Sequence, residues 1–196
     1  MLKCSKTCGR KGFWNTTRRR GSIGSGRLWM ALSRRLLSGG KSSGPNPTDR
    51  AKSGTKRSLL VEGNGVPLAV VAEGANRNDF KLAEPTLENI EIERPEPTKK
   101  HPQNMCMDKG YDYPEVDRLA EEWGYTGHIA RRGVDQSKRE RIPGYRARRW
   151  VVERTHSWMN RFRRLLIRWE KKEENYLAML HFACAWITYQ QTGIIG

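Results

Sequence analysis

The stretch YRARRWVVERTHSWMNRFRRLLIRWE, residues 145–170, is the most informative part of this sequence. It predicts one long helix of about seven turns, at roughly 3.6 residues per turn. Arg154, Arg161 and Arg168 follow one another at intervals of seven and, with further arginines, predict a basic face exposed to solvent. The apolar residues recur at helical spacing and predict one buried stripe, made of Val151, Trp158, Phe162, Leu165, Leu166 and Trp169.

Glu153 is a single carboxylate among these arginines, on the side of the helix away from Val151. Two interpretations are open. Glu153 can form an ion pair with Arg149 one turn earlier on a solvated face, worth a few tenths of a kcal/mol. It can also be a metal ligand on a surface that holds phosphates. Spacing alone favours the ion pair.

The composition favours a nucleic-acid partner. The chain has 196 residues, enough for one ordinary domain and a tail. Its 37 Lys and Arg against 21 Asp and Glu give a net charge of +16, which attracts polyanions. No segment approaches the roughly 18 continuous apolar residues of a membrane span. The four cysteines form no CxxC or Cys/His zinc pattern, and the N-terminus has no apolar signal segment, so we expect a cytoplasmic protein with reduced thiols.

Two parts of the chain differ in character. Residues 1–43 contain no acidic residue and are rich in Arg, Gly and Ser. Such a segment buries too little apolar surface to offset the entropy of ordering, so we expect it to be mostly disordered, with a short basic helix at 28–37 at most. A folded domain is expected over residues 44–196.

The order of predicted elements in this domain indicates an α/β fold with a mixed sheet. A short apolar run ends near Asp108, as a buried strand does when it places a carboxylate at its C-terminal end. The expected elements are strands at 56–61 and 66–72 joined by a tight turn, a helical pattern at 76–89, a strand at 104–109, a helix at 113–123, a strand at 125–130 and a buried helix at 176–189.

Three segments of the sequence resemble those of a known family. They are GPNPTDRAKSGTKRSLLVEGNGVPLAVVAEGANRND, MDKGYD and PGYRARRWVVERTHSWMNRFRRLLIRWEKKEENYLAMLHFACAWI, and they cover roughly residues 44–190. The chain resembles the DDE transposases of bacterial insertion sequences, particularly the group related to insertion sequence five. The resemblance implies a ribonuclease-H-like mixed sheet with flanking helices. It also implies a metal-dependent enzyme that cleaves DNA and transfers strands at the ends of a mobile element.

The resemblance also implies a catalytic site of two Asp and one Glu that holds Mg²⁺ or Mn²⁺. Asp108 in MDKGYD and Glu153 in WVVERTHSW match the second and third acids, so we assign both as catalytic residues and metal ligands. Two Mg²⁺ about 4 Å apart suit phosphodiester attack. With the family in view, the metal-ligand interpretation of Glu153 is favoured. The side chains expected to contact DNA are Tyr145, Arg148, Arg149, Arg154, Arg161 and Arg164.

The first Asp of the family has no counterpart here. In the family it lies in a segment resembling DGAMTKAPLGG, where this chain has WMALSRRLLSGGK, and no acid precedes Asp49. The codons of Trp29-Met30-Ala31, TGG ATG GCN, read GAT GGC, or Asp-Gly, when shifted by two bases. We therefore hypothesise that residues up to about Gly40 are translated out of frame; a genuine basic arm is the alternative. The first strand is then expected to be absent from the sheet, leaving an unpaired edge.

We therefore expect an insertion-sequence transposase that is truncated and catalytically impaired. The alternative is a non-enzymatic DNA-binding remnant that represses the intact transposase. The expected partner is DNA at terminal inverted repeats, in a bacterial nucleoid, and a homo-oligomer is compatible with this function. Glu62, beside the hairpin turn, is expected to be structural, and His156 and His181 are expected on a helix surface and in the core rather than on a metal.

Overall fold

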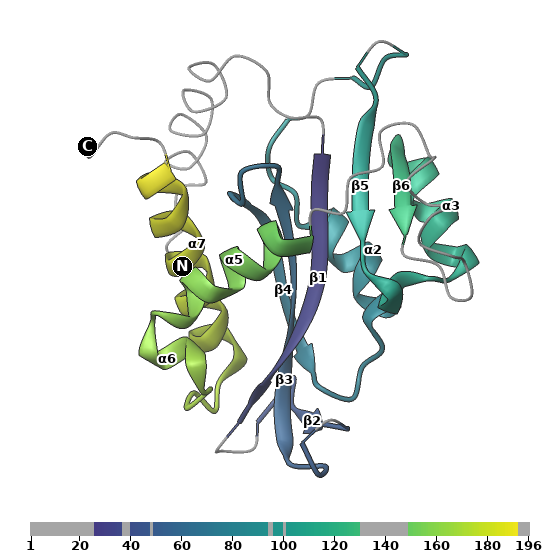
Figure 1. Cartoon of the computed structure of the whole chain (residues 1–196). Coiled ribbons are helices and arrows are strands. Elements are labelled where there is room, and N and C mark those ends of the chain that lie inside the picture. The colour runs from purple at the N-terminus through teal and green to yellow at the C-terminus, as the bar shows by residue number, and fades with distance from the viewer. Residues whose placement is uncertain are drawn as a thin grey trace, which may run out of the picture.

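The computed structural model describes residues 26–36, 40–47, 49–93, 96–99, 101–129 and 149–191. Within them, six strands form one mixed sheet, and helices pack against both of its faces (Figure 1). The strands are β1 (Gly26–Arg35), β2 (Gly44–Pro45), β3 (Ser53–Glu62), β4 (Pro67–Gly74), β5 (Gln103–Met107) and β6 (Tyr125–Ile129). The helices are η1 (Asp79–Leu82), α2 (Ala83–Glu88), η2 (Lys109–Tyr111), α3 (Pro114–Glu122), α5 (Arg149–Asn160), α6 (Arg163–Leu166) and α7 (Glu173–Gln191).

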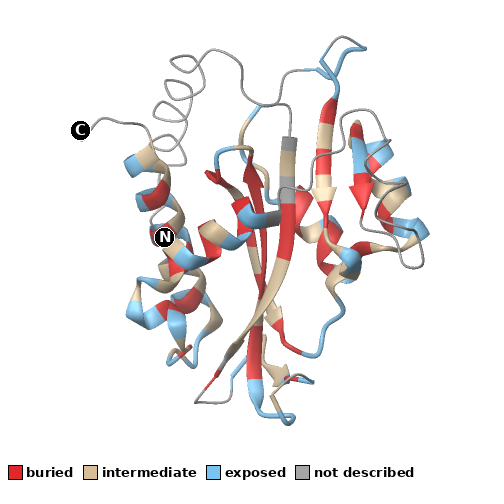
Figure 2. Cartoon of the chain, in the orientation of Figure 1, coloured by how far each residue is buried: buried red, intermediate tan, exposed pale blue. Residues whose placement is uncertain are grey.

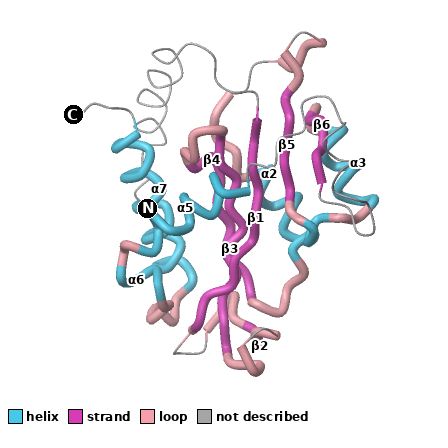
Figure 3. The backbone as a smooth tube through the Cα atoms, in the orientation of Figure 1, coloured by secondary structure: helices cyan, strands magenta, loops and turns pink. Residues whose placement is uncertain are grey.

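β1 lies in the middle of the sheet and joins its two halves (Figure 3). It runs antiparallel to β3, with Trp29 opposite Leu60, and parallel to β5, with Trp29 opposite Met107. β4 pairs antiparallel with β3, and β6 pairs parallel with β5. The sheet is therefore mixed, as predicted, and the architecture is consistent with a ribonuclease-H-like fold.

The expectations for the N-terminal segment are wrong for residues 26–35. They were expected to be disordered, or helical from 28, and the first strand was expected to be missing; instead β1 is a central strand. The physical reason is that its apolar run serves both faces: Trp29 packs in one core cluster and Met30 in the other. A short apolar run buried on both sides has no period that separates strand from helix. Residues 1–25 lie outside the described part of the chain.

The hairpin predicted from KRSLLVEGNGVPLAVVA is confirmed as β3 and β4, each longer than expected. Glu62 closes the turn: its Oε1 accepts a hydrogen bond from the backbone N of Asn64 at 2.8 Å, which bears out its structural role. Gly65 has a φ of +86°, and a Cβ there would lie 2.9 Å from Oγ1 of Thr155. The turn therefore needs glycine both for its backbone conformation and for its close approach to α5.

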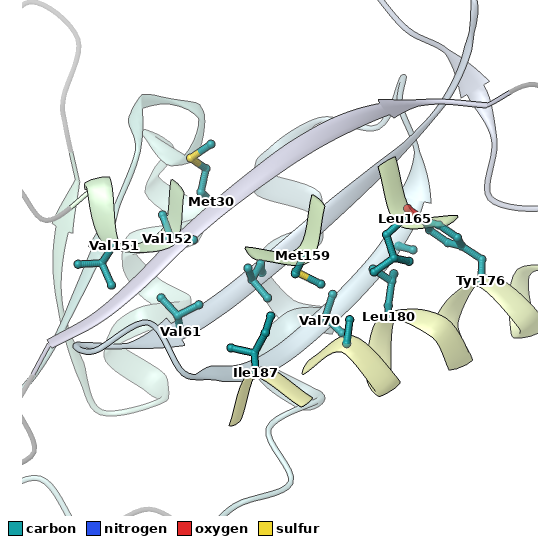
Figure 4. Packing of buried hydrophobic residues seen from close by; sticks show 13 residues of the cluster. Met30, Val61, Val70, Val151, Val152, Met159, Leu165, Tyr176, Leu180 and Ile187 are labelled. Carbon is teal, nitrogen blue, oxygen red and sulfur yellow. The ribbon is translucent and has the colours of Figure 1, made fainter. Parts of the chain in front are cut away.

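Two apolar clusters, one on each face of the sheet, form the core. The face covered by α5 and α7 carries Met30, Val61 and Val70 of the sheet, with Val152 of α5 and Ile187 of α7 packed on them (Figure 4). The opposite face, covered by α2 and α3, carries the second cluster around Trp29, Leu60 and Met107. Buried residues concentrate on the strands and on the sides of the helices that face them (Figure 2).

The single long helix predicted over 145–170 is wrong. α5 ends at Asn160, and Phe162 has an extended backbone (φ −79°, ψ 103°) before the short helix α6. Leu166 and Trp169, expected on the buried stripe, are exposed, because the break in the helix changes the direction of the chain before them. Residues 145–148 lie outside the described residues.

The closing helix α7 is buried on one side only, in contrast to the expectation. Tyr176, Leu180, Ala183 and Ile187 are buried at spacings of four, three and four, while Phe182, Trp186 and Tyr189 are exposed. The reason is position: α7 packs against β4, α5 and α6, all of which lie on the same side of it (Figure 1). Across the part of the chain that the structure describes, no helix has the length and apolar character needed to span a membrane.

Arg168, expected on the basic exposed face, is completely buried. It follows α6 in an extended segment that bridges to Leu36 after β1. Its guanidinium lies 5.0 Å from the ring centre of Tyr176 in α7. Its hydrogen-bond acceptors, at 2.9 to 3.1 Å, are the carbonyl oxygens of Lys41, Ser42 and Glu170 and Oγ1 of Thr55. One side chain therefore connects the segment after β1, strand β3 and the C-terminal helix.

Replacing Arg168 is expected to destabilise the chain strongly. Arg168→Met removes the donor to four acceptors, of which Oγ1 of Thr55 is buried and the others are partly buried, and it removes a fully buried side chain, so we expect a loss of about 3 kcal/mol in the free energy of unfolding. Arg168→Lys keeps the charge but not the planar fork, so an intermediate loss is expected. Urea unfolding measures the difference, with Arg164→Met, at an exposed position, as the control. Equal stability of Arg168→Met and the control would contradict this role.

Candidate active site

Asp108 lies directly after β5, at the C-terminal end of a buried strand as the sequence predicts. The side chain is half-buried, and its Oδ1 accepts a hydrogen bond from the backbone N of Gly110 at 2.8 Å. This bond caps the short helix η2 and holds the carboxylate at the edge of the strand. The strand register therefore determines where this acid lies.

A second carboxylate, Asp79, lies beside Asp108, and no motif or spacing in the sequence predicted its position there. A Cβ built on Gly110 would lie 2.6 Å from Oδ2 of Asp79 and 3.1 Å from Oδ1 of Asp108, so both acids approach one glycine. Asp79 is paired with Lys56, whose Nζ lies 2.6 Å from Oδ1. Burial raises the pKa of Tyr111 well above its usual value, and the negative charges of Asp79 and Asp108 raise it further.

Glu153 lies in the second turn of α5 and is exposed. The neighbouring Val151 and Val152 are buried against the sheet, in the same cluster as Met30 of β1 (Figure 4). Figure 1 shows α5 beside the middle of β1, the strand that pairs with the C-terminal part of β5 through Trp29 and Met107. The structure therefore brings the segments that carry Glu153 and Asp108 to the same part of β1.

The strand between these two segments carries apolar side chains. Trp29 is opposite Met107 in the parallel pairing, so Met30 follows level with Asp108. The indole N of Trp29 donates to Oγ of Ser58 at 2.7 Å in the interior. Among the described residues, no group of three His, Cys, Asp or Glu side chains is placed to hold a metal ion. Within the described residues, Asp108 and Glu153 therefore belong to no set of three carboxylates that could hold a metal ion.

The residues expected to contact DNA fall into three groups. Tyr145, Arg148 and the side chain of Arg149 lie outside the described part of the structure. Arg161 and Arg164 are exposed at the turn between α5 and α6, where Nη1 of Arg164 lies 4.0 Å from Oε1 of Glu170. These two guanidiniums have the exposure that phosphate contact requires.

Arg154, the remaining member of that set, is engaged within the protein. Its guanidinium lies 4.8 Å from the ring centres of both Trp150 and Trp158, one turn before and one turn after it on α5. Its Nη2 donates to the carbonyl oxygen of Asn64 at 2.6 Å. Next to it, Oγ1 of Thr155 donates to the carbonyl oxygen of Gly65 at 2.7 Å. Arg154 and Thr155 therefore fasten α5 to the hairpin turn between β3 and β4.

Comparisons with known proteins show the family of the chain. A model of the family described as "Transposase DDE domain" matches residues 6–188. The chain belongs to the DDE transposase family. It is also 35% identical, over 181 residues, to the candidate transposase of insertion sequence element IS402 from Burkholderia cepacia, covering 89% of this chain and 83% of that protein. By family, this is an insertion-sequence transposase, as the sequence words indicate.

The buried side of α5 in this transposase carries a histidine that sequence analysis placed on a helix surface. His156 is 2% exposed, whereas His181 is on the exposed side of α7, so the two expected positions are reversed. The pKa of His156 is lowered to about 3. Burial is the main cause, and the positive charges of Arg57 and Arg34 add to it. The spacing of apolar residues could not show which of the two histidines is buried, because the exposed side of α7 also carries aromatic residues.

The buried neutral His156 is expected to make the transposase sensitive to acid. Its pKa is depressed, so the unfolded chain binds a proton below pH 6.5 that the folded chain binds only near pH 3. Stability is then complete above pH 6.5 and falls as the pH drops, by about 1.4 kcal/mol per pH unit. Between pH 6.5 and 4.5, wild type is expected to lose about 2 kcal/mol more than His156→Gln.

Urea unfolding at the two pH values measures this difference. The matched control is His181→Gln, on the exposed side of α7, which is expected to follow wild type. The same acid dependence in His156→Gln as in wild type would contradict a buried, neutral His156.

Proposed function

We propose that this member of the family binds DNA but performs transposition chemistry poorly. The observation that carries the proposal is the pairing of Trp29 with Met107, which places an apolar stretch of β1 beside Asp108. A DDE site needs a third carboxylate at this place, by the resemblance. Met30 is instead buried in the core beneath α5.

Asp108 and Glu153 are the catalytic and metal-binding residues that we propose, with Mg²⁺ or Mn²⁺ as the ion. Their support is the position of both segments at the middle of β1 and the family's motif around each. If Mg²⁺ binds there, Asp108 and Glu153 would hold it, and the ion would supply Lewis-acid activation of the phosphodiester. With one acid missing, metal affinity and rate are both expected to fall steeply.

DNA binding is supported by charge and exposure. The chain carries a net charge of +16, and Arg161, Arg163 and Arg164 are exposed together at the turn after α5. Each phosphate that they neutralise steepens the salt dependence of binding. We propose terminal inverted repeats as the DNA partner, with Tyr145, Arg148 and Arg149 as further contacts. The cytoplasm, at the nucleoid, is the proposed location.

The second candidate function is repression. A protein that has exposed arginines but an incomplete set of catalytic acids can occupy DNA ends without cutting them. Such a chain competes with intact transposase for its sites, or joins it in mixed oligomers. Preference for terminal inverted repeats over random DNA of the same length separates this function from nonspecific binding.

The altered segment before residue 41 has a proposed genetic origin. We propose that residues up to about Gly40 are read out of frame, because TGG ATG GCN contains the codons for Asp-Gly two bases later. β1 forms all the same, since the shifted reading happens to yield an apolar run. A gene sequence without a single-base shift near the codons of Gly39 and Gly40 would exclude this origin and leave a genuine basic segment.

The nicking of supercoiled DNA tests the proposed impairment. In Mg²⁺, the purified chain is expected to retard DNA but to leave the plasmid supercoiled. Asp108→Asn and Glu153→Gln are expected to bind DNA as wild type does, because neither change removes a cation. A gel that separates supercoiled from nicked plasmid, together with a binding titration at several salt concentrations, measures both properties.

Two results would contradict this proposal. Metal-dependent nicking that is lost in both variants would mean that Asp108 and Glu153 suffice for catalysis. Absence of DNA binding at low salt would remove the binding function itself.

A further inference from the structure

A cluster of cationic side chains lies between the sheet and the helices α5 and α7. Arg57 of β3 is opposite Leu32 of β1, and Arg34 lies two residues further along β1, so both arginines belong to the same face of the sheet. His156 of α5 lies over them, since the charges of both arginines act on it. The cluster is separate from Asp108 and Glu153 and has no part in the proposed chemistry.

Within the part of the chain that the structure describes, most of the polar atoms in this cluster have no hydrogen-bond partner. Arg57 is completely buried, and its Nε donates to the hydroxyl oxygen of Tyr176 at 2.6 Å, but both its Nη atoms are unpartnered. Among the described residues, Nε of Arg34 is also buried without a partner, and the ring nitrogens of His156 have no partner with good hydrogen-bond geometry, although the backbone of Met30 lies near enough to raise the pKa of His156. A guanidinium has five N–H donors and no acceptor, so Arg57 alone leaves four donors unused.

No carboxylate among the described residues compensates the positive charge of the cluster. Burial lowers the pKa of Arg34, and the positive charge of Arg57 lowers it further. Within the described ranges, no carboxylate is among the charges that shift the pKa of Arg34 or His156. The ring of Tyr176, 5.6 Å from the Arg57 guanidinium, offers only a cation–π contact. A buried guanidinium in this state is costly, because its lost hydration is not replaced.

We propose that a single small inorganic anion, of the size of chloride, binds between Arg57, Arg34 and His156. A spherical anion accepts hydrogen bonds from any direction, so it can satisfy the two Nη atoms of Arg57, Nε of Arg34 and one N–H of neutral His156 together. The burial of the donor atoms favours a small ion: Arg57 is 0% exposed, His156 is 2% exposed, and Nε of Arg34 is buried although the rest of that side chain is partly exposed.

The position of this anion gives it a structural consequence. His156 is one turn after Val152 and three residues after Glu153, on the buried side of α5. An anion shared by α5 and two strands fastens the helix to the sheet at the level where β1 and β3 pair. Anion occupancy therefore stabilises the packing of the helix that carries Glu153, and this holds whether or not the chain cuts DNA.

Thermal unfolding of the full chain tests the site in solution. Potassium chloride replaces potassium gluconate at constant ionic strength, and the midpoint of wild type is expected to rise by roughly 5 °C and then to saturate. Arg57→Met is expected to lose this rise, and the matched control Arg164→Met, at an exposed arginine, is expected to keep it. An equal chloride response in both variants, or none in wild type, would overturn the proposal.

A second measurement does not depend on a variant that folds. Crystals of the wild-type chain soaked in bromide are expected to show an anomalous peak within hydrogen-bond distance of the Nη atoms of Arg57. Peaks confined to exposed arginines, or water refined at this place, would overturn the proposal. Stabilisation by sulfate or phosphate with no response to chloride would also overturn it, because those ions act at the surface.

Discussion

The double pairing of β1 is the constraint on which the rest of the structure depends. One edge of this strand pairs with β3 of the antiparallel hairpin β3–β4, and the other pairs with β5, which pairs in turn with β6. Its alternate side chains enter the two core clusters, so it also couples the helices on the two faces. Without β1, the hairpin and the parallel pair would each expose an edge and half of a core.

The same pairing explains how a transposase fold can keep its shape and lose its chemistry. Backbone hydrogen bonds hold β1 in the sheet whatever its side chains are, provided that both faces stay apolar enough. Trp29 and Met30 meet that condition, and they stand beside Asp108. The neighbourhood of the site is therefore specified by strand register, whereas the reaction requires a particular carboxylate that the register alone does not supply.

Sequence analysis predicted the elements whose signals are local. The hairpin, the strand that ends at Asp108 and the helix α3 follow from alternation and turn residues, and the family words identify the transposase. The predictions were wrong where tertiary contacts determine the local structure. The helical period of 145–170 gives no indication of the break at Phe162, and Arg168 has the spacing of a surface residue although it is fully buried and donates to four acceptors. Composition made β1 look disordered, because its neighbours in the sheet lie far away in the sequence.

Hydrogen–deuterium exchange of the backbone amides in β1 tests the central claim most directly. If β1 is the central strand, those amides of residues 27–34 that face β3 are protected as strongly as the amides of β3, because the pairing with β3 runs along this whole stretch, whereas the pairing with β5 covers only residues 26–29. Exchange of β1 amides at the rate of an unstructured peptide, with β3 protected, would contradict the account. It would mean that the chain folds without its first strand and that Trp29 and Met30 do not stand beside Asp108.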